Sequence, residues 1–569
     1  MRYLALACDY DGTIASGGLV DENTMSALRR FRASGRRLIL VTGRELDDLI
    51  RVCPDLAIFD RVVAENGAVL HDPHTRETRN LAPPPPEALI RELTRRGVEP
   101  LSVGRVIVAT WEPQETAVLQ AIHELQLELQ VIFNKGAVMV LPSGINKATG
   151  LRAQLEEMGL SPHNVVGVGD AENDHAFLST CECAVVVANA LPVLKERVDL
   201  VTSGDHGRGV SELIDRMLAT DLAELEPVLV RHHFTLGQDE KGDDVRLAPY
   251  GEAALIAGPS GSGKSTITTS IIESLCEADY QFCIIDPEGD YQELESAVSL
   301  RGSDGRALTE EALQVLALPT GNLVLNLVDL GLQERPAFFQ RILPQLLEHR
   351  ARTGRPHWVV IDEAHHLLPL DWQPVTQILP ESLGSVLMIT VHPEHMAPAA
   401  RELMECVIAL GDDVSAVAEA LTGSRTDIET AAPPRPRRSG RWACVFRPGT
   451  PPTWIAVRKP EQERQRHRRK YAEGELGPDK SFYFRGKDGR LNLRTHNLGM
   501  FSQIAEGVDD DTWLFHLRRH DYSQWFRESI RDEALAAIAA DTEADESLSA
   551  SESRARIRQA VEDRYTSPT

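Results

Sequence analysis

Two acidic residues near the start of the chain, Asp9 and Asp11, have the type and spacing for phosphoryl-transfer chemistry. They follow the apolar run Leu4-Ala5-Leu6-Ala7-Cys8, which predicts a buried strand. Ligands of parallel sheets bind beyond the carboxyl ends of the strands, so we expect both carboxylates in one crevice. One acid would attack phosphorus, while the other would protonate the leaving oxygen and later activate water. Gly12 permits the sharp turn, although Asp-x-Asp-Gly alone also forms ordinary turns.

Four further polar residues stand near predicted strand ends or helix starts. The hydroxyl of Thr42 and the turn amides after it would hold a phosphate oxygen. Lys147, just before a predicted helix, would neutralise phosphate charge. Asp170 and Asp174 follow the apolar run 165–168 and are hard oxygen ligands suited to Mg²⁺. Together with the first pair, these residues predict a magnesium-dependent phosphoryl-transfer site.

In this order, the segments resemble the four motifs of the haloacid-dehalogenase (HAD) superfamily: Asp9-x-Asp11-Gly12-Thr13, Thr42-Gly43-Arg44, Lys147 and Gly169-Asp170-x-x-Asn173-Asp174. The segment Glu65-Asn66-Gly67-Ala68, and an insertion between the second and third motifs, are similar to the Cof-type branch with an α/β cap. That branch includes many sugar-phosphate phosphatases. The resemblance covers about residues 1–215 and implies a sugar phosphate or another small phosphomonoester as substrate.

The resemblance also implies a role for each motif residue. Asp9 would be the nucleophile and Asp11 the general acid and base, while Thr42 and Lys147 would bind phosphate. The implied Mg²⁺ ligands are Asp9, the backbone carbonyl of Asp11 and Asp170, with Asp174 in support.

A second site is indicated by a glycine-rich segment that follows the apolar run 253–257 and opens a predicted helix. Its pattern, Gly-x-x-x-x-Gly-Lys-Ser between a strand and a helix, is typical of a loop that binds ATP phosphates. Backbone amides would cradle the phosphates, Lys264 would reach the β and γ oxygens, and Ser265 would ligate Mg²⁺. The predicted nucleotide-binding residues are Gly258, Ser260, Gly261, Ser262, Gly263, Lys264, Ser265 and Thr266.

An Asp-Glu pair, Asp362 and Glu363, ends the apolar run 358–361 about 100 residues later. Asp362 would organise the Mg²⁺ water shell, and Glu363 would polarise a water that attacks the γ-phosphate, which favours hydrolysis over transfer. With 283–291 and 386–393, these segments resemble the HerA/FtsK-type ATPases across residues 229–458. Members of that family include DNA-pumping motors that work as rings, which implies a homo-oligomer.

Two further features of this ATPase resemblance rest on position along the sequence. His392 or a neighbour stands where the sensor strand usually carries Gln, and Thr390 or His392 would lie near the γ-phosphate. A histidine at such a strand end is as typical of a structural contact as of sensing. Arg401 is a candidate for a finger acting on a neighbouring subunit by its position alone.

A chain of 569 residues exceeds one hydrophobic core. Alternating strand and helix patterns predict an α/β multidomain protein: a Rossmann-like parallel sheet with an α+β cap, a nucleotide-binding α/β domain, and a small, mostly α-helical C-terminal domain. The predicted boundaries are 1–82 and 142–220 for the phosphatase core, 83–141 for its cap, 225–458 for the ATPase domain, 461–540 for the helical domain and 541–569 for a polar, disordered tail.

The net charge of −25 disfavours polyanionic partners overall, yet residues 433–470 carry twelve Lys and Arg against two Glu. This basic segment fits either a nucleic-acid contact or a solvated linker. The sequence contains no apolar run of about 20 residues, so no membrane span is expected. Eight scattered cysteines are typical of thiols in a reducing cytoplasm.

Three functions fit these patterns. The first is a bifunctional phosphatase and ATPase that uses Mg²⁺ and ATP. The second is a nucleic-acid enzyme, either an end-processing enzyme of the polynucleotide kinase-phosphatase type or a DNA translocase. The third is a scaffold in which bound ATP regulates the phosphatase without being hydrolysed.

Overall fold

The computed structural model divides into two compact units, Met1–Gly258 with Ser274–Ala456, and Pro259–Glu273 with Val457–Thr569. It describes residues 2–259, 261–371, 383–411, 414, 417, 442–460, 476, 481–486, 489, 491–530, 532–545 and 547–565. No helix among these residues is both long and apolar enough to cross a bilayer.

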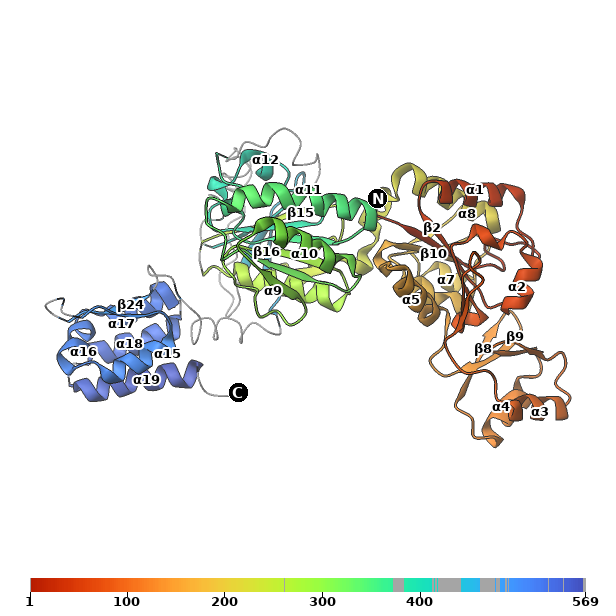
Figure 1. Cartoon of the computed structure of the whole chain (residues 1–569), viewed down its shortest axis with the longest axis horizontal. Helices are drawn as coiled ribbons and strands as arrows, with labels where there is room; N and C mark the ends of the chain where they lie inside the picture. Colours follow the sequence, from red (N-terminus) through yellow and green to blue (C-terminus); the bar gives the residue numbers. More distant parts are fainter. Residues whose placement is uncertain are drawn as a thin grey trace. The chain divides into compact units, whose positions relative to one another are not determined.

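The first sheet has eight strands in the order β12-β11-β10-β1-β2-β3-β4-β5. Two of its strands, β2 and β10, are labelled in Figure 1. The strands from β12 to β3 are parallel, and β4 and β5 are antiparallel additions at one edge. Their bounds are Ala5–Cys8 for β1, Arg37–Val41 for β2, Arg61–Ala64 for β3, Val69–His71 for β4, Thr78–Asn80 for β5, Val165–Gly169 for β10, Cys183–Val186 for β11 and Leu200–Val201 for β12.

Helices cover both faces of this sheet because successive side chains of each strand point to opposite sides. Leu6 and Cys8 pack with α1 (Glu22–Ala33) and α8 (His206–Thr220). Ala5 and Ala7 pack with the helices of the opposite layer. These are α5 (Lys147–Met158), α6 (His175–Thr180) and α7 (Pro192–Lys195), while α2 (Leu46–Val52) follows β2.

The cap, inserted between β5 and α5, is a four-stranded antiparallel sheet in the order β6-β7-β9-β8. One face packs on α3 and α4 through a separate apolar cluster, and Met139 and Leu141 on the other face join the core of the main domain. The bounds are α3 Glu87–Arg95, β6 Ser102–Val103, β7 Val108–Trp111, α4 Glu115–Glu124, β8 Leu129–Asn134 and β9 Ala137–Pro142.

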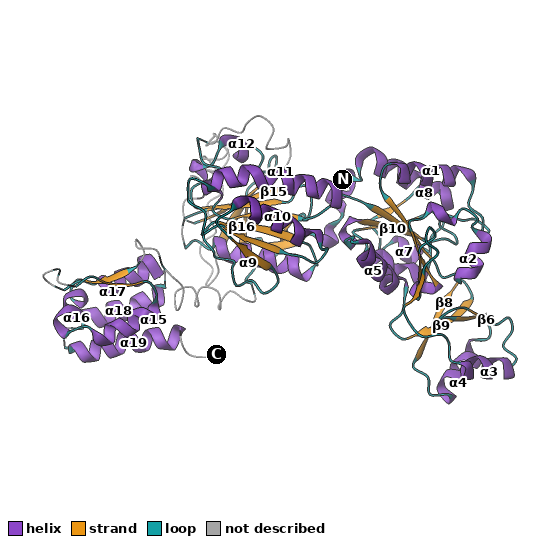
Figure 2. Cartoon of the chain, viewed as in Figure 1, coloured by secondary structure: helices purple, strands orange, loops and turns teal. Residues whose placement is uncertain are grey.

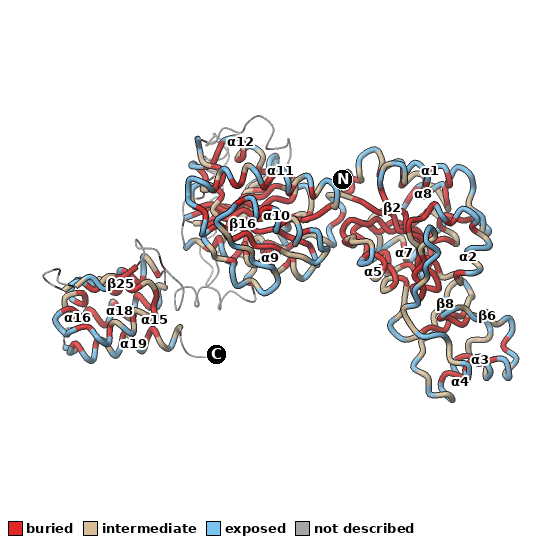
Figure 3. The backbone as a smooth tube through the Cα atoms, in the orientation of Figure 1, coloured by how far each residue is buried: buried red, intermediate tan, exposed pale blue. Residues whose placement is uncertain are grey.

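The second sheet has eleven strands, of which the seven from β21 to β17 are parallel, with antiparallel strands at the other end. Figure 2 draws the strands in orange. The strands are β13 Phe234–Gln238, β14 Asp244–Leu247, β15 Ala253–Ala257, β16 Phe282–Asp286, β17 Val298–Arg301, β18 Leu323–Asn326, β19 Trp358–Ile361, β20 Val386–Thr390, β21 Cys406–Leu410, β22 Trp442–Phe446 and β23 Thr453–Val457. The helices are α9 Lys264–Glu277, α10 Gly305–Ala317, α11 Arg335–Thr353 and α12 Pro398–Arg401. Both sheets lie in the buried interior, as Figure 3 shows by colour.

The C-terminal part combines a β-hairpin with helices around an aromatic core that includes Phe482, Phe501 and Trp513. The elements are β24 Phe482–Phe484, β25 Leu493–Thr495, α15 Leu498–Gly507, α16 Asp510–Leu517, α17 Asp521–Trp525, α18 Glu533–Ala544 and α19 Ala550–Tyr565. The α/β class and the helical C-terminal part were therefore predicted correctly.

The prediction of a disordered tail at 541–569 is wrong for residues 547–565, most of which form α19. Small and apolar residues of this helix are buried in the aromatic core, among them Ile557 and Val561. Ser553 accepts a hydrogen bond from the Trp513 indole at 3.0 Å. The polar run misled the prediction because only one face of α19 needs to be apolar.

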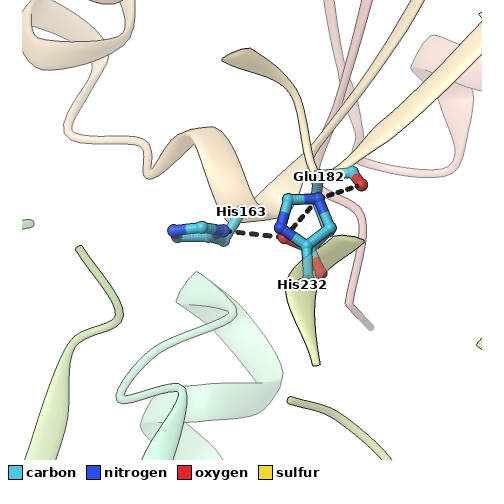
Figure 4. Close-up of side chains that lie close together, drawn as sticks. All are labelled: His163, Glu182 and His232. Atoms are coloured by element: carbon cyan, nitrogen blue, oxygen red, sulfur yellow. Dashed lines mark hydrogen bonds and ion pairs between the residues drawn. The ribbon is translucent and has the colours of Figure 1, made fainter. Parts of the chain in front are cut away.

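A buried carboxylate, Glu182, joins the two α/β domains within the first unit (Figure 4). It accepts hydrogen bonds from Arg2 at 2.8 Å, from His163 Nδ1 at 2.7 Å and from the Tyr280 hydroxyl at 2.9 Å. His163 also reaches the Ala278 carbonyl through Nε2 at 2.6 Å. Both ring nitrogens of His163 therefore have oxygen partners. We call Arg2, His163, Glu182, His232 and Tyr280 the Glu182 cluster.

His232 completes this cluster by donating from Nε2 to the Glu182 backbone carbonyl at 2.9 Å. Two imidazoles beside a carboxylate could in principle hold a metal ion. Here, however, the carboxylate oxygens and both His163 nitrogens already have protein partners, and the Arg2 cation lies against the carboxylate. The cluster is therefore a polar joint between domains rather than a metal site.

Candidate active site

The predicted catalytic acids meet at the carboxyl edge of the first sheet. Asp9 follows β1 and Asp170 follows β10, and these strands pair with Cys8 opposite Val168. Carboxylate oxygens of Asp9, Asp170 and Asp174 all lie within 4.8 Å of one another. Adjacent parallel strands end at the same edge, which is why residues more than 150 positions apart come together.

Lys147 is buried among these acids. Its ammonium donates to Asp9 Oδ1 at 2.6 Å and to Asp174 Oδ1 at 2.5 Å. The residue opens α5, whose start is fixed by Asn146, since the Asn146 side chain accepts from the amide of Thr149. The helix start thus brings a cation among the predicted catalytic acids.

Three carboxylates share this buried pocket with the Lys147 ammonium, and the pKa values of two of them are raised. Burial raises the pKa of Asp9 to about 7, with Asp174 adding to the rise and Lys147 opposing it. Burial also raises the pKa of Asp170. Carboxylates of this kind, with the Asp11 carbonyl beside them, form the hard oxygen set that Mg²⁺ prefers. The residues present therefore fit the predicted metal.

Asp174 and Thr13 organise the other acids. Asp174 Oδ2 accepts from the backbone amides of Asp170 and Ala171, both at 2.9 Å. The Thr13 hydroxyl lies 3.3 Å from Asp9 Oδ2 and 3.2 Å from Asp170 Oδ1. These contacts hold the motif loops at fixed spacing, which is the support that a catalytic constellation needs.

Arg44 holds the second acid, Asp11, in a two-pronged ion pair with distances of 2.5 and 2.7 Å. The same guanidinium contacts Asp48 at 2.6 Å. Thr42 is buried beside them, and its hydroxyl accepts from the Arg44 amide at 3.1 Å. Asp11 is thus oriented by a neighbour whose contact the sequence analysis did not anticipate.

Two cap contacts were also missed. The buried carboxylate of Glu65 accepts three successive amides of the cap, those of residues 105–107, at 2.8–3.1 Å. Lys135, at the tip of the β8–β9 hairpin, reaches Asp170. A signal for the hairpin existed, because Lys135-Gly136 separates two strand patterns by exactly the length of a tight turn.

The predicted nucleotide-binding loop connects β15 to α9. Gly261 and Gly263 have φ values of 80° and 110°, which side chains other than glycine rarely adopt. Lys264 opens α9, and its ammonium donates to the Pro259 carbonyl at 3.0 Å. Ser265 and Thr266 follow in the first turn, while Ser260 lies outside the described residues.

The predicted hydrolytic acids, Asp362 and Glu363, follow β19. Asp286, which had no predicted role of its own, ends the neighbouring strand β16, and the two strands pair in parallel with Ile285 opposite Ile361. Burial raises the pKa of Asp362 well above its usual range, with Glu363, Asp290 and Asp286 adding to the rise. Glu363 has a φ of 42° in the turn that follows β19. These acids also form a set suited to a divalent cation.

The candidate sensor residues contact each other. The Thr390 hydroxyl lies 3.0 Å from His365 Nδ1, and it accepts from the His392 amide at 3.0 Å. The His392 ring pairs with Glu394 at 3.0 Å. Arg401 is the last residue of α12. The end of β20 therefore carries a network of polar contacts, and these contacts do not distinguish sensing from a structural role.

With this geometry in place, comparison with known proteins identifies the chain. A family model described as haloacid dehalogenase-like hydrolase matches residues 6–101 and 97–214. A phosphoglycolate phosphatase of Methanothermobacter thermautotrophicus is 31% identical over 225 residues, which span 38% of this chain and 98% of that protein. The chain belongs to the haloacid dehalogenase-like hydrolases. A second model, helicase HerA central domain, matches residues 252–351, so this hydrolase also carries a HerA-type domain.

A second relative agrees with this assignment. A phosphoglycolate phosphatase of Haloarcula marismortui is 31% identical over 218 residues, covering 37% of this chain and 95% of that protein. Among solved structures, a haloacid dehalogenase-like hydrolase from Bacteroides thetaiotaomicron is 19% identical and covers 38% of this chain and all of that one, with a TM-score of 0.34. Each of these matches thus spans less than half of the present chain.

Proposed function

We propose that the N-terminal hydrolase domain is a Mg²⁺-dependent phosphomonoesterase that forms a phosphoaspartate at Asp9. The observation that carries this proposal is the meeting of Asp9, Asp170 and Asp174 around Lys147 at one sheet edge. Asp9, the Asp11 carbonyl and Asp170 would hold the metal. A bound Mg²⁺ would neutralise charge on the phosphoryl oxygens.

Two steps follow from the residues themselves. The Asp9 carboxylate attacks phosphorus, the bond to the leaving oxygen breaks, and Asp11 gives that oxygen a proton. Asp11 then takes a proton from water, which attacks the same phosphorus and releases inorganic phosphate and free Asp9. Lys147 and Thr42 offset the negative charge of the transferring group. Arg44 orients Asp11 between the two steps.

For the substrate we propose a small phosphomonoester. The relatives are named phosphoglycolate phosphatases, and a neighbour among solved structures is titled a sugar phosphatase. Turnover of the full chain should be measured on 2-phosphoglycolate, sugar phosphates, nucleotides and 3′-phosphorylated DNA with Mg²⁺. Preference for a small phosphomonoester is expected. Preference for 3′-phosphorylated DNA would favour the end-processing alternative instead.

We also propose that the HerA-type domain binds and hydrolyses ATP. The glycine-rich loop before α9 and the acids at 286, 362 and 363 support this, since each is a set of residues that nucleotide hydrolysis needs. Glu363→Gln should abolish ATP turnover while ATP binding is retained. Phosphate transfer to a polynucleotide 5′ end by this variant would indicate a kinase. Negligible turnover by the unsubstituted chain would indicate an ATP-gated scaffold.

Lys264→Ala provides the matching binding variant. It should abolish ATP binding, measured by titration calorimetry, and leave phosphatase turnover unchanged. Loss of both activities would mean that the phosphatase depends on the nucleotide site. Residues 433–441 and 461–470 of the basic segment lie outside the described residues, and a nucleic-acid partner and a ring-shaped homo-oligomer stay proposals. Stimulation of ATP turnover by DNA would support the first, and light scattering would measure the second.

A further inference from the structure

The turn that follows β20 in the HerA-type domain carries two imidazoles and a carboxylate within four residues. In the segment His392-Pro393-Glu394-His395, the last three residues form a short 3₁₀ helix, η8 (Pro393–His395). The His395 amide donates to the His392 carbonyl at 3.1 Å and closes the turn. Side chains three positions apart in a 3₁₀ helix lie one above the other. The two imidazoles therefore face the same side, and their rings stack with centroids 4.8 Å apart.

The backbone of this turn is held by its buried neighbours. Pro393 and Met396 are both buried, and the proline ring fixes φ at the first position of η8. The His392 amide donates to the hydroxyl of Thr390, a fully buried residue of β20, at 3.0 Å. The two imidazoles and the carboxylate, in contrast, are between 49% and 60% exposed. The turn is therefore a fixed base from which three polar side chains extend into solvent.

The donor atoms of these side chains are almost at the spacing of a metal site. A nitrogen of each imidazole and a carboxylate oxygen all lie within 4.8 Å of one another. Glu394 Oε1 lies 3.0 Å from His392 Nδ1 and 3.9 Å from His395 Nε2. In a tetrahedral Zn²⁺ site, with bonds of about 2.0–2.2 Å, neighbouring donors are roughly 3.4 Å apart. Rotation of exposed side chains can close a remaining gap of about 1.5 Å without moving the backbone.

The carboxylate of Glu394 is not committed to a permanent cation. Its ion-pair partners are the two imidazoles, and no Lys or Arg in the part of the chain that the structure describes pairs with it. In the Glu182 cluster, by contrast, the Arg2 cation already lies against the carboxylate. Two imidazoles and one carboxylate are a ligand set that proteins use for Zn²⁺, whereas Mg²⁺ prefers oxygen ligands alone. The donor set at this turn therefore favours a transition metal.

We propose that His392, Glu394 and His395 form a binding site for a divalent transition metal, with Zn²⁺ as the ion to test. Three protein ligands leave a coordination position for water. The bound ion would tie the three side chains together and so hold the turn at the end of β20, beside the contact between Thr390 and His365. The site differs in ligand type from the oxygen sites proposed for Mg²⁺, and it depends on neither proposed activity.

The test is a Zn²⁺ titration of the full chain by calorimetry in excess Mg²⁺, which fills the oxygen sites. The unsubstituted chain should bind one Zn²⁺ that Glu394→Gln and His395→Gln lose. Removing an outer partner of a metal ligand already weakens binding about 10- to 100-fold, so removing a ligand should weaken it at least ~100-fold. Both positions are exposed, so these substitutions should leave the fold intact. His123→Gln, at an exposed histidine of the cap, is the matched control and should bind Zn²⁺ as the unsubstituted chain does.

Co²⁺ in place of Zn²⁺ gives a second readout, because its visible absorption responds to the type and geometry of its ligands. The absorption expected for imidazole ligands should be present in the unsubstituted chain and in His123→Gln, and it should be lost in His395→Gln. Unchanged Zn²⁺ affinity in Glu394→Gln or His395→Gln would overturn the proposal. So would an unsubstituted chain that binds no Zn²⁺ in excess Mg²⁺. Neither measurement uses turnover, so its result is separate from the phosphatase and ATPase assignments.

Discussion

The phosphatase site and the Glu182 cluster are both buried groups of charges, but they balance charge in opposite ways. In the phosphatase site three carboxylates surround Lys147, and the pKa of Asp9 is raised to about 7, chiefly by burial. In the Glu182 cluster one carboxylate receives Arg2, His163 and Tyr280. There burial would raise the pKa of Glu182, but His163, His232 and Arg2 hold it well below its usual range.

This difference in charge balance indicates that the first group of residues serves catalysis, whereas the Glu182 cluster stabilises the contact between the domains. Surplus negative charge in a buried pocket is unfavourable for folding and suits a region that binds a cation and a phosphoryl group. A carboxylate with every oxygen satisfied contributes to the folded state instead. Substitutions in the phosphatase site should therefore lower activity while stability is kept. Substitutions in the Glu182 cluster should lower stability while the catalytic residues are unaffected.

The largest effect is expected at Glu182. Glu182→Ala leaves the Arg2 cation and the His163 ring buried without their carboxylate, which should lower the free energy of unfolding by roughly 3–5 kcal/mol. Chemical denaturation of the full chain measures this change. Glu22→Ala, which removes an exposed partner of Arg29, should cost about 1 kcal/mol or less. An equal loss of unfolding free energy in both variants would mean that the Glu182 cluster stabilises the fold no more than an exposed ion pair does.

The next effect concerns Asp9 and should have the opposite profile. Asp9→Asn removes the nucleophile, so phosphatase kcat should fall at least ~100-fold. Since it also removes one of three crowded acids, the unfolding free energy should not decrease. Asp215→Asn, at an exposed aspartate of α8, is the control for charge. Activity that survives in Asp9→Asn would show that the nucleophile is misassigned.

The smallest effect is a pH dependence at the joint. Burial lowers the pKa of His232 from 6.5 to about 4, with Arg231 and His163 adding to the fall. Between these values the unfolded chain binds a proton that the folded chain does not. Stability should therefore fall as pH drops from about 6.5 towards 4, by up to about 1.4 kcal/mol per pH unit from this residue.

His232→Gln keeps a donor for the Glu182 carbonyl but cannot titrate, so its stability should depend less steeply on pH over that range. Denaturation curves at pH 7, 6 and 5 would measure the slope. His123→Gln, at an exposed histidine of the cap, should leave the slope unchanged. An identical slope for both variants would place the proton uptake elsewhere, for example at His357, whose pKa is also lowered by burial.

Much of the candidate site could be predicted because the end of a buried strand can be recognised from a short stretch of sequence. Apolar runs that end in Asp9 and Asp170 fix both residues at one sheet edge, whatever the details of the loops. The Glu182 cluster could not be predicted in this way. Its members lie on separate segments of two domains, and no periodicity in the sequence records which domain surfaces meet.

Lys135 was missed for a related reason. Its turn was readable from sequence, but the place that the hairpin tip reaches depends on how the cap lies against the core. The helix at 550–565 was missed because its buried face is made of small and widely spaced residues such as Ser553 and Ile557. In both cases tertiary packing, rather than local propensity, decided the outcome.

The Glu65 carboxylate has a consequence for how the cap is held. Three consecutive amides of the cap, those of residues 105–107, donate to this one buried side chain just after β3. Losing the carboxylate would leave all three amides without their acceptor in a single step. The attachment of the cap at this point therefore depends on one residue that takes no part in handling phosphate.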